Sequence, residues 1–307
     1  MGSTGRVPSR GFHGDLDGAI EGDVPALASF SADCQAFAVC GSDGRARAYE
    51  CAGGRLLGQL PLGAGGTGQE PGAGTGAGHL EARYTAVLWT PPPEQAPAGR
   101  STRRSRAAAK RPEEACGLVV LGTASGEVSA WAVAKDELVW RAERTHEGAV
   151  TALAYVGVAG GCIFSAGADG RVCELDLSGG SRRAKWSAAS EDGRPRLGCI
   201  AVSADGSKVL TGAEGLALYD GSSRERLCRF SGHVVPAHAA AFEPSGAYAV
   251  TASASDQGVA VWRCDERGVE EAQGPGAKGA AAVLKMEGAP VSAAAGAGGG
   301  GGGPPAA

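Results

Sequence analysis

The sequence contains no asparagine and no apolar run of the roughly 20 residues that a membrane-spanning helix needs. Its first residues, MGSTGRVPSRGFHG, lack the apolar core of a secretory signal peptide, and Arg6 stands where a myristoylation motif requires Ser or Thr. The nine cysteines show no CxxC spacing, which argues against a zinc site and against a disulfide framework. These absences predict a soluble intracellular chain with reduced cysteines.

Catalytic signatures are also missing. The sequence has no P-loop, no GxSxG elbow and no HExxH motif, and its run GAGGTGQEPGAGTGAG lacks the strand–turn–helix context of a phosphate cradle. His233 and His238, five residues apart, would point to opposite faces of a strand, which disfavours metal chelation. A formal net charge of -4 argues against a protein that grips nucleic acid along its whole surface. We therefore expect no enzyme activity, cofactor, metal or small-molecule substrate.

The main feature of the sequence is an internal repeat. Five segments each read as a short strand, a tight turn and a second strand that ends on a large apolar residue; these closing residues are Tyr49, Trp131, Leu175, Tyr219 and Trp262. The last three intervals are 44, 44 and 43 residues. Apolar runs such as YTAVLWT and AVTALAYV predict a further strand in each unit, and Gly-containing turns are predicted at 203–206 and 243–246. A period of this length with four strands per unit is typical of WD-repeat β-propellers.

The first interval is longer, 82 residues, and two insertions account for the excess. One is a Gly-rich loop at 63–78 and the other a Pro- and Arg-rich loop at 94–115. We predict an all-β chain: a disordered N-terminus over 1–25, propeller blades over 26–270, and a mostly disordered low-complexity tail over 271–307. Residues 279–291 could begin a sixth blade, but five units leave the propeller incomplete.

Certain polar residues fit the hydrogen-bonded tie of a WD-repeat blade, in which a His before the first strand meets an Asp in the tight turn, with a Trp six residues after the Asp. The fifth unit has all three, the third has the His and Asp with Leu175 as its closing residue, and the first keeps only the Asp with Tyr49. In the second unit the Asp is replaced by Ser125, and in the fourth the turn is shortened around Glu214. We interpret the tie residues as structural; they are His233, Asp256, Trp262, His146, Asp169 and Asp43.

A basic run interrupts the second unit. Six positive charges fall within twelve residues of an otherwise acidic chain: Arg100, Arg103, Arg104, Arg106, Lys110 and Arg111. Such a run self-repels and cannot pack into a core. It indicates a nuclear-localisation segment, a local contact with RNA or an acidic partner, or a solvated loop.

The order of the units, with a basic insertion inside the second, resembles WD repeat protein family forty-three, known in yeast as U three protein five. The resemblance rests on FSADCQAFAVCGSDGRARAYE, on YTAVLWTPP with LVVLGTASGEVSAWAV, and on HEGAVTALAYV with IFSAGADGRVCELDL. It continues through IAVSADGSKVLTGAEGLALYD and FSGHVVPAHAAAFEPSG, over roughly residues 27 to 265. Members of the family carry further blades and a C-terminal helical domain, which this sequence does not show; that departure is consistent with a truncated gene model or a divergent form.

The resemblance implies a nucleolar scaffold, a t-UTP subunit of the small-subunit processome that supports transcription and processing of 18S ribosomal RNA. Its implied partners are other WD-repeat and helical subunits of a ribosome-assembly complex, with a local or indirect contact to precursor RNA. The alternative is a generic adaptor, such as a ubiquitin-ligase substrate receptor or a signalling scaffold, in the cytoplasm. A third hypothesis is a propeller hydrolase, but no sequence motif supports it.

Overall fold

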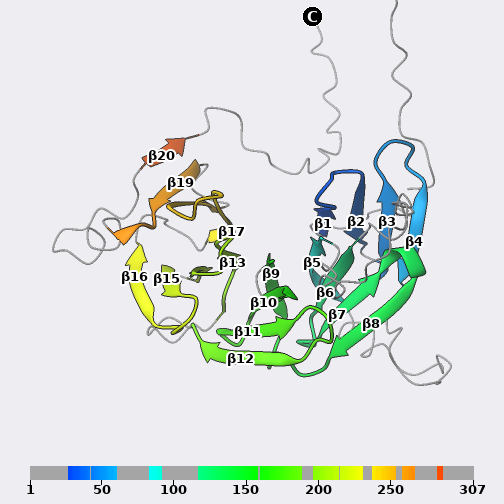
Figure 1. Ribbon diagram of the computed structural model, residues 1–307, viewed down its shortest axis with the longest axis horizontal. Helices are drawn as coiled ribbons and strands as arrows, with labels where there is room; N and C mark the ends of the chain where they lie inside the picture. The colour runs from blue at the N-terminus through cyan, green and yellow to red at the C-terminus, as the bar shows by residue number, and fades with distance from the viewer. Residues whose placement is uncertain are drawn as a thin grey trace, which may run out of the picture.

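The fold is seen in a computed structural model that describes residues 27–41, 43–60, 83–91, 117–157, 160–188, 196–213, 215–230, 237–253, 258–266 and 282–285. The strands form five four-stranded sheets, and within each sheet consecutive strands pair antiparallel. Figure 1 shows the sheets set side by side along an open arc, in sequence order, with the first and fifth at its two ends. The prediction of an all-β chain built from four-stranded blades is confirmed.

Each blade corresponds to one repeat of the sequence. Blade one holds β1 (Leu27–Phe30), β2 (Ala36–Cys40), β3 (Ala46–Glu50) and β4 (Leu56–Leu60). Blade two holds β5 (Tyr84–Thr90), β6 (Leu118–Thr123), β7 (Val128–Ala132) and β8 (Glu137–Ala142), with a 3-10 helix, η2 (Val133–Lys135), between the last two. Blade three holds β9 (Val150–Val156), β10 (Cys162–Gly167), β11 (Arg171–Asp176) and β12 (Arg182–Ser187). Blade four holds β13 (Cys199–Val202), β14 (Lys208–Gly212), β15 (Leu216–Asp220) and β16 (Arg226–Phe230). Blade five holds β17 (Ala237–Phe242), β18 (Tyr248–Ser253), β19 (Gly258–Arg263) and β20 (Ala282–Lys285).

The last strand differs from its sequence-based interpretation. The sequence leaves open that residues 279–291 begin a sixth blade; in the structure, β20 pairs with β19 as the outermost strand of blade five, with Ala282 opposite Val261. A stretch of 18 residues separates the two strands, whereas the other third and fourth strands follow one another after short turns. Because of this long connection, the sequence pattern did not identify β20 as the fourth strand of blade five.

The predicted turns at 203–206 and 243–246 form between the first and second strands of blades four and five. Gly206 and Gly246 have φ values of 75° and 72°, a left-handed conformation that favours glycine. The amide of Gly206 donates to the carbonyl of Ser203 at 2.9 Å, and the Asp205 carboxylate accepts from the amide of Ser207 at 3.0 Å. The turn residues thus set the register of the strands they join.

Side chains alternate between the two faces of every sheet, and the blades pack through those faces. We call the side that carries the closing residue the closing face and the opposite side the receiving face. In blade two the closing face, with Trp131 and Leu121, packs against Ala38 and Ala48 of the receiving face of blade one. The same arrangement recurs at the next three junctions, where Leu175, Tyr219 and Trp262 pack toward the preceding blade. One type of interface therefore holds all five blades together.

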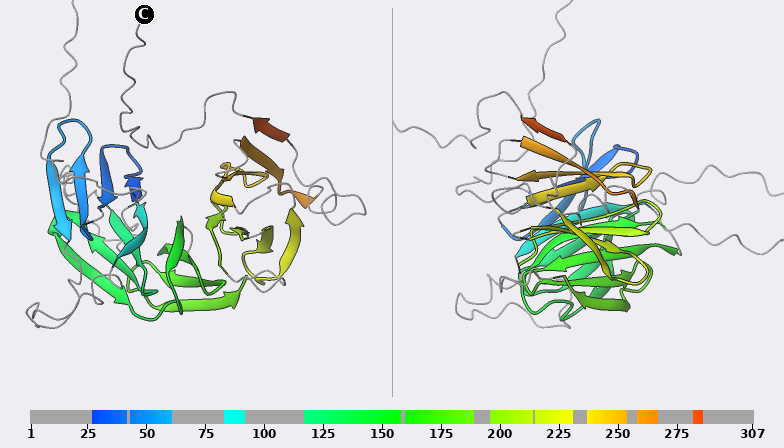
Figure 2. Two further views of the ribbon diagram at one scale, coloured as in Figure 1. Left: turned by 180° about the vertical axis from the view of Figure 1, so that it is seen from behind. Right: turned by 90° about the vertical axis from the view of Figure 1, so that its left-hand side faces the viewer.

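Polar bonds reinforce the junctions. The hydroxyl of Thr85 on β5 donates to the carbonyl of Val150 on β9 at 2.6 Å, and the indole N–H of Trp140 donates to the carbonyl of Leu177 at 2.7 Å. Between blades three and four, the Arg224 guanidinium forms two bonds with the Glu174 carboxylate, at 2.9 and 3.1 Å. These bonds join blade two to blade three and blade three to blade four. Figure 2 shows the resulting stack of sheets from the side.

Candidate functional site

The most elaborate polar site in the described chain lies in blade three. His146, just before β9, places its Nδ1 2.9 Å from Oδ1 of Asp169 in the turn between β10 and β11. Its Nε2 lies 2.9 Å from Oγ of Ser165 on β10. The structure thus brings together the predicted pair His146 and Asp169, and it adds Ser165, which sequence reasoning missed.

Burial governs the electrostatics of this site. It lowers the pKa of His146 below the ordinary histidine value, although the hydrogen bond that the ring donates to the Asp169 carboxylate acts in the opposite direction. The neutral ring then donates from Nδ1 to Asp169 and accepts at Nε2 from the Ser165 hydroxyl. Burial raises the pKa of Asp169, but the amides of Glu147 and Arg171 and the His146 ring outweigh it and hold that pKa below its usual range.

A serine, a histidine and an aspartate in this order resemble the hydrolytic triad, so access to the serine decides between chemistry and structure. Ser165 is 0% exposed and His146 is 2% exposed. A nucleophile must reach a substrate carbonyl, and this hydroxyl has no surface from which to do so. The cluster acts as a tie that joins the entry to β9, the second strand and the tight turn.

Blade five shows the complementary half of such a tie. The indole N–H of Trp262 on β19 donates to the hydroxyl of Thr251 on β18 at 2.6 Å, and both side chains are buried. Its predicted partners His233 and Asp256 lie outside the described residues. Trp262, the closing residue of blade five, pairs with Ala249 on the neighbouring strand. Thr251 therefore stands two residues after the strand partner of the closing residue, and we call this place the bonded register position.

The same register position can be followed through the other blades. In blade three it holds Ser165, and in blade four it holds Thr211, on the same face of the sheet as Tyr219. In blades one and two it holds Val39 and Leu121. A hydroxyl side chain in the middle of a mostly apolar second strand, as in IFSAG and AVTAS, was the sequence signal that could have revealed this position.

Leu121 leaves a buried donor without an acceptor in blade two. The indole Nε1 of Trp131 is buried and has no hydrogen-bond partner, because an aliphatic side chain occupies the place that Thr251 has in blade five. A buried unsatisfied N–H costs about 1–3 kcal/mol. Blade two therefore carries a defect that blade five lacks.

We expect Trp262→Phe to lower the free energy of unfolding more than Trp131→Phe does. Both substitutions remove the same atoms from a fully buried indole, but only the first breaks a hydrogen bond, the one from the Trp262 indole to the Thr251 hydroxyl. The difference should be about 1–2 kcal/mol. Urea unfolding followed by far-ultraviolet circular dichroism measures it, and equal losses in the two variants would contradict the assigned bonding.

Asp43, the predicted tie residue of blade one, has a different setting. Its carboxylate is 44% exposed, pairs with the Arg47 guanidinium and accepts from the amide of Arg45 at 3.1 Å. No histidine bonds to it within the part of the chain that the structure describes. The third residue expected there, Tyr49, is half-buried and stacks on Phe37 with 5.5 Å between ring centroids.

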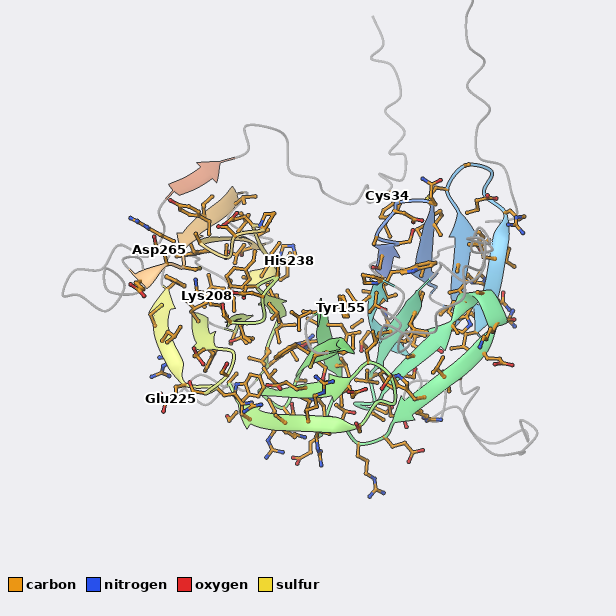
Figure 3. All side chains as sticks on the ribbon, in the orientation of Figure 1. Cys34, Tyr155, Lys208, Glu225, His238 and Asp265 are labelled. Atoms are coloured by element: carbon orange, nitrogen blue, oxygen red, sulfur yellow. The ribbon has the colours of Figure 1, made fainter. Side chains whose placement is uncertain are left out.

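The basic run from Arg100 to Arg111 lies outside the described residues, as do both loop insertions, 63–78 and 94–115. Among the residues that are described, no group of three or more His, Cys, Asp or Glu side chains is placed to hold a metal ion. Likewise, no helix in that part of the chain is both long and apolar enough to cross a bilayer. In Figure 3, Tyr155 and His238, on the innermost strands β9 and β17, mark the inner side of the arc, and Glu225 marks its outer side.

Comparison with known proteins gives one informative similarity. The chain is 25% identical over 228 residues to human WD repeat-containing protein 43, and the match covers 74% of this chain and 31% of the human protein. The chain therefore spans less than a third of that relative. No protein-family model matches it. Together with the five blades and their polar ties, the similarity supports membership of the WD-repeat proteins, and the fold is that of WD-repeat propeller blades set in an open arc.

Proposed function

We propose that the chain is a non-enzymatic scaffold in the maturation of small-subunit ribosomal RNA in the nucleolus, where it binds protein subunits of a ribosome-assembly complex. The observation that carries the proposal is the similarity to human WD repeat-containing protein 43, which extends over 228 residues and 74% of this chain. The basic run inside the second repeat supports a nuclear location.

The architecture supports a binding role over a catalytic one. The serine–histidine–aspartate cluster of blade three is buried, and the blades offer instead broad sheet faces, edges and turns. Surfaces of this kind hold other proteins without chemical turnover. A local contact with precursor RNA would use the basic run, since the chain as a whole carries a net charge of -4.

The test compares the location of the fluorescently tagged chain with that of a variant in which Arg103, Arg104, Arg106, Lys110 and Arg111 are changed to Ala. We expect nucleolar signal that disperses in the variant. The reason is that the basic run, which would bind an import receptor or RNA, loses its positive charge. A matched control changes three arginines on the blades, Arg55, Arg182 and Arg226, to Ala and should stay nucleolar. Depletion of the protein should cause unprocessed small-subunit precursor RNA to accumulate.

Cytoplasmic signal that ignores the substitutions, together with normal precursor RNA, would refute the proposal. That result would favour the alternative, a WD-repeat adaptor for ubiquitin ligation or signalling.

A further inference from the structure

Two of the described cysteines differ from the rest in their access to solvent. Cys34 is exposed and Cys51 is partly exposed, whereas the other described cysteines are buried: Cys40, Cys162, Cys173, Cys199, Cys228 and Cys264. Burial raises the pKa of each of these six thiols to about 11 or 12. Because the thiolate is the reactive form of cysteine, the buried six are protected from oxidants. Cys34 and Cys51 are the accessible thiols of the described chain.

The two accessible thiols belong to neighbouring turns of blade one. Cys34 lies in the turn between β1 and β2, where Figure 3 labels it, and Cys51 directly follows β3. The amide of Cys51 donates to the carbonyl of Gln35 at 2.8 Å. This bond continues the pairing of Glu50 with Ala36 by one residue. Cys51 therefore lies opposite Gln35, the residue next to Cys34.

Blade four repeats this arrangement with glycines. Gly206 takes the place of Cys34, with a corresponding hydrogen bond to the residue three before it, and both have a left-handed φ, 75° and 56°. Gly221 takes the place of Cys51, and its amide donates across the strands at 2.7 Å in the same way. A Cβ added to Gly221 would stand 1.9 Å from the carbonyl oxygen of Gly206. A side chain at the second position therefore lies against the main chain of the first.

The separation of the two cysteines suits a disulfide. Directly opposed residues of an antiparallel pair have Cα atoms about 5 Å apart, and a step of one residue along the strand adds about 3.3 Å at right angles. The Cα atoms of Cys34 and Cys51 are therefore about 6 Å apart. Disulfides join residues whose Cα atoms are about 4.4–6.8 Å apart. The two thiols can be joined with little movement of the turns.

Packing does not explain a cysteine at the second position of blade one. This position lies two residues after the closing residue, and in blades two, three and five it holds Val133, Leu177 and Cys264. All three are buried in the apolar clusters between blades. Cys51 has the same place in its blade but remains partly exposed. A core role, which accounts for Cys264, therefore does not account for Cys51.

We propose that Cys34 and Cys51 form a reversible disulfide in the presence of hydrogen peroxide, so that blade one carries an oxidant-sensitive modification site. The thiolate of Cys34, the more exposed residue, attacks the peroxide; the O–O bond breaks, the sulfur becomes a sulfenic acid, and the released hydroxide is protonated to water. The Cys51 thiolate then attacks that sulfur, the S–S bond forms and the second oxygen leaves as water. Two thiols lose two electrons and two protons, and one peroxide is reduced to two molecules of water. This inference does not depend on the scaffold role proposed above.

The disulfide joins the turn before β2 to the turn after β3 and closes a loop that contains both strands. A cross-link of this kind stabilises mainly by restricting the unfolded chain. The oxidised protein should therefore need more urea to unfold than the reduced protein. A thiol reductant reopens the bond by exchange, since neither residue is buried.

Differential alkylation of the purified full chain after peroxide treatment tests the proposal. Thiols that remain are blocked with N-ethylmaleimide in urea, oxidised ones are reduced with dithiothreitol and labelled with iodoacetamide, and the labelled peptides are identified by mass spectrometry. We expect Cys34 and Cys51 to acquire the second label together, at least about tenfold faster than any of the six buried cysteines. When the reduction step is omitted, the peptides of the two should be recovered joined.

Two variants separate a disulfide from independent oxidation of each thiol. Cys51→Ala leaves Cys34 without a second thiol, so its sulfenic acid should persist and react with dimedone, unlike that of the parent chain. Cys34→Gly restores the residue that blade four has at this place, so the variant should fold, and its Cys51 should stay reduced. Peroxide should raise the urea midpoint of the parent chain and leave that of Cys34→Gly unchanged.

Three outcomes would overturn the proposal. The first is equal dimedone labelling of Cys34 in the parent chain and in Cys51→Ala. The second is pairing of either thiol with a different cysteine. The third is that both stay reduced at peroxide concentrations that oxidise free glutathione. None of these readouts depends on cellular location or on precursor RNA, so failure of the ribosomal proposal leaves this test intact.

Discussion

Replacing Gly126 with alanine is expected to destabilise the chain by about 3 kcal/mol or more, because two costs combine at one position. Gly126 lies in the turn between β6 and β7 with a φ of 85°, which side chains rarely adopt. A Cβ there would stand 2.2 Å from the carbonyl oxygen of His146 and 2.7 Å from that of Gly148, both backbone atoms. The carbonyl of Gly126 also accepts from the amide of His146 at 2.9 Å, so displacement of the turn would disturb the entry to blade three.

Gly160 provides the matched control. Its φ of 86° is nearly the same, but an added Cβ would meet nothing within 4 Å. Gly160→Ala should therefore show the backbone cost alone, about 1–2 kcal/mol. Urea denaturation followed by circular dichroism compares the two variants. Similar losses in both would show that the turn moves away from His146 at little cost, against the tight packing described between blades two and three.

The repeat made most of the fold predictable. A strand with alternating apolar residues needs a sheet to cover it, and five copies of the same strand–turn–strand pattern require five similar sheets. The turns at 203–206 and 243–246 followed from glycines that adopt positive φ. In these segments the turn residues and the apolar alternation indicate the same strands, so the sequence predicts the strands correctly.

Prediction failed where the deciding contact is distant in sequence. The strand β20 is short and follows a long connection, so only its pairing with β19 reveals that it belongs to blade five. Ser165 and Thr251 look like ordinary strand residues until the register places them opposite a histidine or a tryptophan. Asp43 also fits the tie pattern in the sequence, and only the structure shows that its carboxylate is largely exposed and pairs with Arg47.

Position in the arc accounts for the missing hydroxyl in blade one but not in blade two, where Leu121 stands at the bonded register position although the closing face is buried. Blades three and four, which have neighbours on both sides, carry a hydroxyl at the bonded register position, and so does blade five through Thr251. Blade one has Val39 there and exposes an aromatic face instead. A blade whose closing face is free gains little from a buried polar tie, since a tie stabilises by satisfying groups that burial would otherwise leave unpaired.

Asp169→Ala should lower the free energy of unfolding by about 2–4 kcal/mol, because it removes the acceptor for several donors at once. The carboxylate is 6% exposed and accepts from His146 Nδ1 at 2.9 Å and from the amides of Glu147 and Arg171 at 3.1 and 3.2 Å. Lys185 Nζ lies 3.6 Å away. Loss of the carboxylate leaves the buried ring N–H without an acceptor and frees the tight turn from the entry to β9.

Asp43→Ala is the matched comparison, since Asp43 occupies the same place in blade one, six residues before its closing residue. Its carboxylate is largely exposed and pairs with Arg47 at the surface, where such pairs contribute about 0–1 kcal/mol. Chemical denaturation should therefore separate the two variants by at least about 1 kcal/mol. If both cost the same, the tie would draw its stability from the turn alone and the His146 bond would add nothing. A large loss for Asp169→Ala that Asp169→Asn partly restores would assign the difference to the acceptor oxygen, because asparagine keeps one oxygen for the His146 ring while it loses the charge.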